Sequence, residues 1–170
     1  MRLLALDCST HVGVAFYSDR RATPALDTWH APRLADRDQL GPLFAAFEDW
    51  LCDLLHTLKP DVLAFEAPIL PRNRVFQKAR AIRLSYGWAE IAERIAYQRK
   101  VRCIECHPST VKLRLAGHGT ARKHHMIAAA TRLGIDVATE HEADAIGVAL
   151  TAFDHIDPPQ QELPEIASHP

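Results

Sequence analysis

Three acidic residues interrupt apolar stretches in which a carboxylate contributes little to folding. Asp7 and Glu66 each end a run of four apolar residues. Asp144 lies in the first turn of an otherwise apolar helical stretch, where a carboxylate is costly unless it is paired or bound to a metal ion. His141 precedes Asp144 by three residues and therefore shares its helix face. Gathered at one point, these four side chains would form an oxygen-rich site with one imidazole.

Such a donor set suits Mg²⁺ or Mn²⁺ better than a metal that prefers thiolates. Two ions of this kind, about 4 Å apart, can activate a water molecule and stabilise the departing oxygen of a phosphodiester. If the strands that precede Asp7 and Glu66 are parallel neighbours, both carboxylates emerge at the sheet edge where open α/β proteins bind their ligands. The residues therefore point to metal-dependent hydrolysis of a phosphodiester.

Each residue alone has a simpler interpretation. An acid at a strand end often forms a turn, Asp144 could be an acid that favours a helix start, and His141 could be a surface histidine. Glu142 points about 100° away from His141 on a helix of 3.6 residues per turn. We therefore expect Glu142 to be an acid that is solvated or favoured by the helix dipole, and it is the first substitute if His141 is passive. The combination of residues is what favours a metal site.

Positive charge is concentrated in one part of the chain. The net charge is −1, yet residues 72–123 contain 13 Lys and Arg against 3 Asp and Glu. A solvated helix face would normally carry both signs. The basic segment therefore favours binding to nucleic acid or to another polyanion.

The hydrophobic pattern predicts an α/β domain with a mixed sheet and helices packed on it. Expected strands cover 2–8, 12–17, 25–30, 61–66 and 101–106. Expected helices cover 36–58, 75–98, 122–133 and 141–155, the third with Thr120 as its N-cap and Gly134 at its end. Residues 1–157 would form one domain, and the proline-rich residues 158–170 a disordered tail.

The sequence also indicates the cellular compartment, and with it the redox state of the cysteines. No apolar run approaches the roughly 20 residues of a membrane-spanning helix, and Asp7 makes the N-terminus a poor signal peptide. We therefore expect a cytoplasmic protein without disulfides. Cys103-Ile-Glu-Cys106-His107 has the spacing of a c-type haem attachment, but its strand-like pattern favours buried thiols over haem or zinc.

Several motifs, in order along residues 2–155, resemble the RuvC family of Holliday junction resolvases. Those that carry the acids are Leu3-Leu-Ala-Leu-Asp7 with Gly13-Val-Ala-Phe16, Ala64-Phe-Glu66, and His141-Glu-Ala-Asp144-Ala-Ile-Gly-Val-Ala-Leu150. The family's basic segment and helix motif are matched by Val111-Lys112, Gly117-His-Gly119, Ala121-Arg-Lys123 and Leu84-Ser-Tyr-Gly87.

The resemblance implies an RNase H-like fold, with a five-stranded mixed sheet flanked by helices, and a homodimer that cleaves four-way DNA junctions. Asp7, Glu66 and Asp144 would bind two Mg²⁺ ions per active site, with Mn²⁺ as an alternative. His141 would be a metal ligand or would help to activate water. The basic side chains expected to bind DNA are Arg72, Arg74, Lys78, Arg80, Lys112, Arg114, Arg122 and Lys123.

Two departures from the family pattern follow Glu66. The family often has an aromatic residue there that wedges into the junction, whereas this chain has Ala67-Pro-Ile69. Phe76 is the candidate wedge, with a place in the core as the alternative. The unusually basic stretch that follows suggests a phage or prophage type of resolvase that accepts several branched DNAs.

We therefore expect a metal-dependent, structure-selective endodeoxyribonuclease that resolves junctions by symmetric nicks, in the nucleoid of a bacterial or phage-infected cell. The alternatives are a junction-binding protein without catalysis and a nuclease for RNA–DNA hybrids. An ATPase of the sugar-kinase and actin type is disfavoured, because 170 residues cannot hold its two domains. One side of residues 82–96, with Ala89, Ala92 and Ala96, could form the dimer face or could pack on the sheet.

Overall fold

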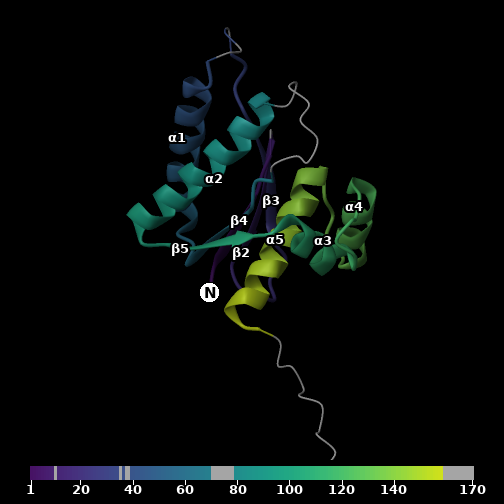
Figure 1. Cartoon of the computed structure of the whole chain (residues 1–170). Helices are drawn as coiled ribbons and strands as arrows, with labels where there is room; N and C mark the ends of the chain where they lie inside the picture. Colours follow the sequence, from purple (N-terminus) through teal and green to yellow (C-terminus); the bar gives the residue numbers. More distant parts are fainter. Residues whose placement is uncertain (10, 35, 37–38, 70–78, 159–170) are drawn as a thin grey trace, which may run out of the picture.

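The chain folds into a five-stranded mixed sheet with helices on both faces (Figure 1). The computed structural model describes residues 1–9, 11–34, 36, 39–69 and 79–158. Antiparallel pairing joins β1 to β2 and β2 to β3, whereas β1, β4 and β5 are parallel. The strand order across the sheet is β3 (Ala25–His30), β2 (His11–Tyr17), β1 (Leu3–Cys8), β4 (Val62–Glu66) and β5 (Arg102–Cys106). The expected α/β class with a mixed sheet is confirmed.

The helices divide between the two faces. On one face lie α1 (Gly41–Leu58) and α2 (Ala79–Arg99). On the other, α5 (Glu140–Ile156) packs on β1 and β2, while α3 (Pro108–Ala116) and α4 (Lys123–Arg132) pack against α5 (Figure 1). Among the described residues, no helix is long and apolar enough to cross a membrane.

The face under α1 and α2 is filled by large side chains. Trp88 and Phe47 are fully buried, and their ring centroids lie 4.6 Å apart. Trp29 reaches this cluster from β3, with its ring centroid 5.6 Å from that of Phe47 and 5.3 Å from that of Trp50. Aromatic side chains of this size bury about 150–250 Å² each, so this face contributes much of the hydrophobic stabilisation.

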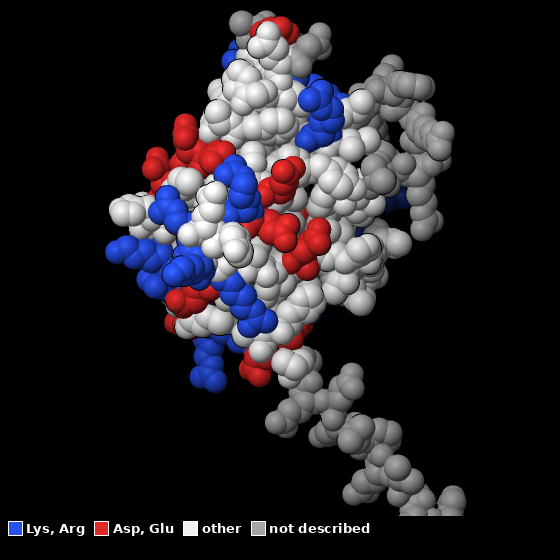
Figure 2. Space-filling model, turned by 60° about the vertical axis from the view of Figure 1, so that its left-hand side comes forward, with Lys and Arg blue, Asp and Glu red and all other residues white. Residues whose placement is uncertain are grey.

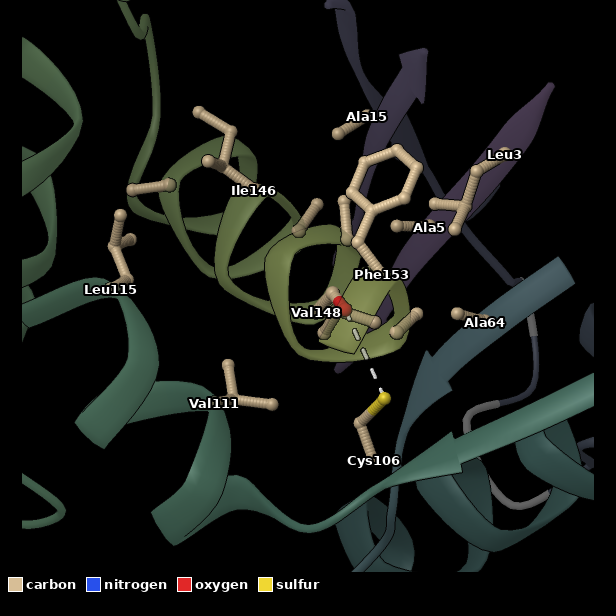
Figure 3. Packing of buried hydrophobic residues seen from close by; sticks show 14 of the residues in the cluster. Leu3, Ala5, Ala15, Ala64, Cys106, Val111, Leu115, Ile146, Val148 and Phe153 are labelled. Atoms are coloured by element: carbon tan, nitrogen blue, oxygen red, sulfur yellow. Dashed lines mark hydrogen bonds between the residues drawn. The ribbon is translucent and has the colours of Figure 1, made fainter. Parts of the chain in front are cut away.

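The face under α5 is built from small side chains. Ala5 pairs with Ala15 on one side and with Ala64 on the other, which makes a row of alanines across three central strands. Figure 3 shows this row beneath α5, with Phe153 and Val148 of the helix lying over it. The floor of small residues lets the helix approach the sheet closely.

The cysteines are free thiols, as expected, and Cys8 and Cys106 are buried. The Cys106 thiol donates to the carbonyl oxygen of Val148 at 3.8 Å and so joins β5 to α5 (Figure 3). Burial raises the pKa of Cys106 to about 12, so it remains a thiol at neutral pH.

Helix α3 was not expected from the sequence. Its nine residues have only a weak apolar stripe, and the helix depends on its ends. The His107 side chain accepts a hydrogen bond from the backbone of Ser109, Pro108 is the first helical residue, and Gly117 ends the helix at φ 84°. Arg122 is the N-cap of α4, so the expectation of Thr120 there was wrong.

The small-residue side of α2 packs inside the chain. Ala92, Ile95 and Ala96 are fully buried against the sheet, and Ala89 and Ile91 are less than a tenth exposed. This side is therefore not available as a dimer face, and packing on the sheet is the interpretation that holds. Helix α1 begins at Gly41, later than the pattern predicted.

Candidate active site

Strand register brings Asp7 and Glu66 together. Because β1 and β4 are parallel and Leu6 pairs with Phe65, Asp7 and Glu66 are the next residues along neighbouring strands. Side chains alternate between the faces of a sheet, so both acids share the face of Ala5 and Ala64, which α5 covers. The predicted parallel arrangement of these two strands is confirmed.

Helix α5 brings His141 and Asp144 to the same edge. Gly13 stands opposite Asp7 on β2, and a Cβ at Gly13 would lie 1.9 Å from the backbone oxygen of His141. Only glycine therefore allows the first turn of α5 to approach the acids this closely. The helix starts at Thr139, whose side chain accepts a hydrogen bond from the backbone of Glu142.

His141 is held by Asp7 of β1 and by Ser9 of the turn that follows. Its Nδ1 lies 2.8 Å from Asp7 Oδ2, and since a carboxylate can only accept, Nδ1 carries the proton. Ser9 Oγ lies 3.0 Å from the same nitrogen. The Asp7 hydrogen bond raises the pKa of His141, while partial burial opposes that rise. Ser9 was missed by the sequence reasoning, since a serine two residues after a strand acid is also an ordinary turn residue.

Glu142 is buried, so it is not the solvated acid that was one of its two interpretations, although it does lie in the first turn of α5, where the helix dipole favours an acid. Its Oε2 accepts from the backbone N–H of Ala138 at 2.7 Å, and its Oε1 accepts from Thr28 Oγ1 at 3.3 Å. Thr28 Oγ1 lies 2.8 Å from Thr139 Oγ1. These contacts fasten the first turn of α5 to β3. Glu142 does lie on a different side of α5 from His141, but that side packs against the edge of the sheet and does not face solvent.

Burial and mutual repulsion raise the pKa values of two of the acids. The pKa of Glu66 is raised to about 8 by burial first and then by the charges of Asp7 and Asp144. Burial and the charge of Asp7 likewise raise the pKa of Asp144 to about 7. The positive charge of Lys112 in α3 opposes both shifts. Repulsion of this kind is what a divalent cation would relieve.

The donor set fits Mg²⁺ or Mn²⁺, since it offers carboxylate oxygens with one imidazole and no thiolate. The residues that would hold the ions are Asp7, Glu66, Asp144 and His141. Within the described ranges, no three or more His, Cys, Asp or Glu side chains already have donor atoms grouped as metal ligands.

Two hollows meet at Lys112. One, of about 360 Å³, is lined by Asp7 and Glu66 and by the start of α2. The other, of about 550 Å³, is lined by Asp144 and by Arg122 and Lys123 at the start of α4. Lys112 borders both. The hollows at which the acids lie are thus also lined by Lys112, Arg122 and Lys123, whose positive charge attracts an anionic group.

The other residues predicted to bind DNA are placed less uniformly. Arg114 forms a salt bridge with Asp154 of α5, and Lys123 pairs with Glu140. Arg80 has a buried Nη1 without a hydrogen-bond partner in the described part of the chain. Four predicted residues lie outside the described residues, namely Arg72, Arg74, Lys78 and the wedge candidate Phe76.

Comparison with known proteins gives matches of structure only, because no family model and no curated protein matches the sequence. The fold is similar to that of Thermus thermophilus RuvC, at 23% identity and a TM-score of 0.64, over 92% of this chain and 96% of that one. The same RuvC in complex with Holliday junction substrate gives 23% identity, a TM-score of 0.66, and coverage of 92% and 94%.

The yeast mitochondrial Holliday junction resolvase Ydc2 is similar at 11% identity and a TM-score of 0.61, over 88% of this chain and 76% of that one. Identities this low establish a likeness of fold. The chain therefore has the RNase H-like fold of these resolvases, as the resemblance of its motifs implied.

Proposed function

We propose that this chain is a metal-dependent endonuclease that resolves four-way DNA junctions by paired, symmetric nicks. The observation that carries the proposal is the convergence of Asp7, Glu66 and Asp144 at one sheet edge beside Lys112. Burial and repulsion raise the pKa of Glu66 to about 8 and that of Asp144 to about 7. Such a cluster favours divalent cations, two per site, with Mg²⁺ or Mn²⁺ as the ion. The fold shared with junction resolvases supports the choice of substrate.

The surrounding side chains suit a phosphodiester. Lys112 can hold a DNA phosphate between the two hollows it borders. His141 is fixed through Nδ1, so its Nε2 is left to bind a metal ion or to take a proton from the attacking water. Asp7, Glu66 and Asp144 would hold the ions, which would supply Lewis-acid activation of that water and charge stabilisation for the departing 3′ oxygen. The products would carry a 5′-phosphate and a 3′-hydroxyl.

The partners proposed are branched DNA and a second copy of the chain. Resolution of a four-way junction into two duplexes takes two symmetric nicks, which the two active sites of a symmetric dimer would supply together. Since the small-residue side of α2 is packed inside the chain, the dimer would form through another surface.

A cleavage assay tests the proposal. End-labelled four-way junction, linear duplex, flap and RNA–DNA hybrid would each be incubated with Mg²⁺, Mn²⁺ or EDTA, with Asp7→Asn as the control. We expect symmetric, metal-dependent nicks near the branch point, and none with the variant. Junction binding without cleavage would instead indicate a binding protein, and cleavage of the hybrid alone would keep the acids but change the substrate.

A further inference from the structure

A third hollow lies at the opposite edge of the sheet from the acids. The ends of α1 and α2 and the starts of β1, β4 and β5 form its walls, and its volume is about 470 Å³. Five residue steps along β1 separate Arg2 from Asp7, which is about 17 Å at roughly 3.3 Å per residue. We call this the distal basic hollow, and its polar lining consists of Arg2, His56, Lys59, Asp61, Arg99 and Lys100.

Positive charge dominates the distal basic hollow. Asp61 is its one carboxylate, and Arg2 already engages it, with the Arg2 backbone N–H donating to Oδ2 at 2.7 Å. Lys59, Arg99 and Lys100 form no ion pair within 4.0 Å among the residues the structure describes. Figure 2 shows Lys and Arg side chains gathered on the left-hand part of that view, with Asp and Glu side chains beside them. Cations held close together around a hollow attract an anion.

The backbone at Lys59 and Lys100 adds a second observation. Their φ values of 46° and 57° are the only positive ones among the described non-glycine residues. Lys59 follows α1, and Lys100 follows α2 in a Schellman motif, in which the N–H of Val101 bonds to the carbonyl of Ala96. Glycine is the usual residue at such positions because it has no Cβ. The chain thus carries lysine twice where glycine fits the backbone better, both times at this hollow.

Helix ends alone do not account for this arrangement. Partial negative charge at the C-terminal ends of α1 and α2 favours a nearby cation. That effect explains a basic residue in the last turn of each helix, but it does not require lysine at a left-handed position. An external anion accounts for all of these features.

We infer that the distal basic hollow binds the phosphate backbone of DNA, as a contact separate from the catalytic edge. The inference rests on the proposed function, since DNA is the polyanion that the acids and Lys112 would process. The apolar lining from Leu55, Pro60 and Val101 offers a surface for the sugars between phosphates. In a branched substrate, this contact would hold a part of the DNA that does not reach the acids.

The variant Lys59→Gly with Lys100→Gly tests the inference. Glycine suits both φ values, so the variant loses two ammonium groups without strain in its backbone. Fluorescence anisotropy would measure binding of labelled four-way junction in EDTA from about 50 to 200 mM salt. We expect about tenfold weaker binding and a salt slope lower by about 1 to 2. Cleavage at saturating protein with Mg²⁺ should stay within about twofold of wild type.

A matched control removes two charges elsewhere. Arg21 and Arg132 are exposed and do not line the distal basic hollow, so Arg21→Ala with Arg132→Ala should bind within about twofold of wild type. Equal affinity of the glycine variant and wild type would overturn the inference, and wild-type cleavage would leave the proposed function standing. Binding that depends on both lysines without any cleavage would support the hollow and overturn the nuclease. A wild type that binds no DNA would overturn both.

Discussion

The two faces of the sheet differ in the size of the side chains that cover them. Beneath α1 and α2, the large side chains of Trp88, Phe47 and Trp29 fill a thick layer. Beneath α5, the row of Ala5, Ala15 and Ala64 leaves the helix almost directly on the strands. Large side chains bury more apolar area, and small ones allow closer approach. We infer that one face mainly stabilises the fold and the other mainly sets the position of the site.

Because α5 packs closely on the sheet, its first turn contacts side chains of the strands. Asp7, Gly13 and Thr28 are paired across β1, β2 and β3, and the first turn of α5 lies over this row. The Asp7 carboxylate therefore contacts His141, and the Thr28 hydroxyl contacts Glu142. Gly13, which lies between them, has no side chain to hold the helix away. A bulkier floor would lift the helix and separate its Asp144 from the strand acids.

The largest effect should come from the site itself. Asp144→Asn removes a proposed metal ligand and should reduce junction cleavage at least 1,000-fold, on the order of other losses of a catalytic group. It should not destabilise the metal-free protein, since it also removes a repelled charge. Single-turnover cleavage and thermal unfolding would be measured side by side, with the exposed Asp136→Asn as a control. Near-normal cleavage by the variant would remove Asp144 from the mechanism.

Substitutions in the sheet face under α1 and α2, the aromatic face, should lower stability far more than cleavage. Trp88→Ala opens a cavity among Phe47, Phe44 and Trp29 and should lower the free energy of unfolding by about 3–5 kcal/mol. Cleavage per folded molecule should change by less than about threefold at a temperature where the variant is folded. Urea unfolding and active-site titration would separate the two quantities.

Trp88→Phe is the milder variant for that test. It keeps a ring in the cluster and removes an indole N–H that has no hydrogen-bond partner in the described part of the chain. We expect a loss of about 1–2 kcal/mol. A large loss of cleavage per folded molecule in either Trp88 variant would mean that the aromatic face also positions the site.

A glycine-to-alanine substitution can be made on each face of the sheet, at Gly13 under α5 and at Gly87 in α2. A Cβ at Gly13 would meet the backbone oxygen of His141 at 1.9 Å, whereas a Cβ at Gly87 would meet the Phe44 ring at 2.2 Å. Backbone of a packed helix cannot yield, but a ring can rotate. Gly13→Ala should therefore lower stability by about 1–3 kcal/mol and cleavage by about 100-fold. Gly87→Ala should lose less stability and keep most of the cleavage, and equal loss of cleavage would remove the distinction between the faces.

Sequence reasoning succeeded where the signal is local and periodic. The apolar runs before Asp7 and Glu66 identified two strands, and the acids at their ends met because parallel strands end at one edge. Helix α3 was missed because a short helix held by its caps has little periodicity. The burial of Glu142 was missed because it depends on Thr28, more than 100 residues away in the chain. Spacing gives the angle around a helix but not what lies there.

The acids should also make stability depend on pH. A carboxyl whose pKa is raised on folding stabilises the native state below its unfolded pKa, and that contribution is lost as pH rises through the folded value. For Glu66 the window runs from about 4.5 to about 8. Glu66→Gln should therefore unfold like wild type near pH 4 and be about 1–2 kcal/mol more stable at pH 8 in EDTA, with the shift discounted for partial exposure. Thermal unfolding at both pH values checks this, and a variant less stable at pH 8 would show that burial and repulsion do not raise the pKa of Glu66.

The smallest effect should come from the contact that fastens α5 to the edge strand. Glu142→Gln keeps an oxygen for the backbone of Ala138 but weakens the charge-assisted bonds to it and to Thr28. We expect about 1 kcal/mol of lost stability and a three- to tenfold lower kcat with KM for junction nearly unchanged, because the helix start would be less well fixed. Thr28→Val, which removes the hydroxyl at similar volume, should reproduce part of the effect. If both variants lowered stability but left kcat intact, Glu142 would belong with the aromatic face, as a residue that holds the fold and not the site.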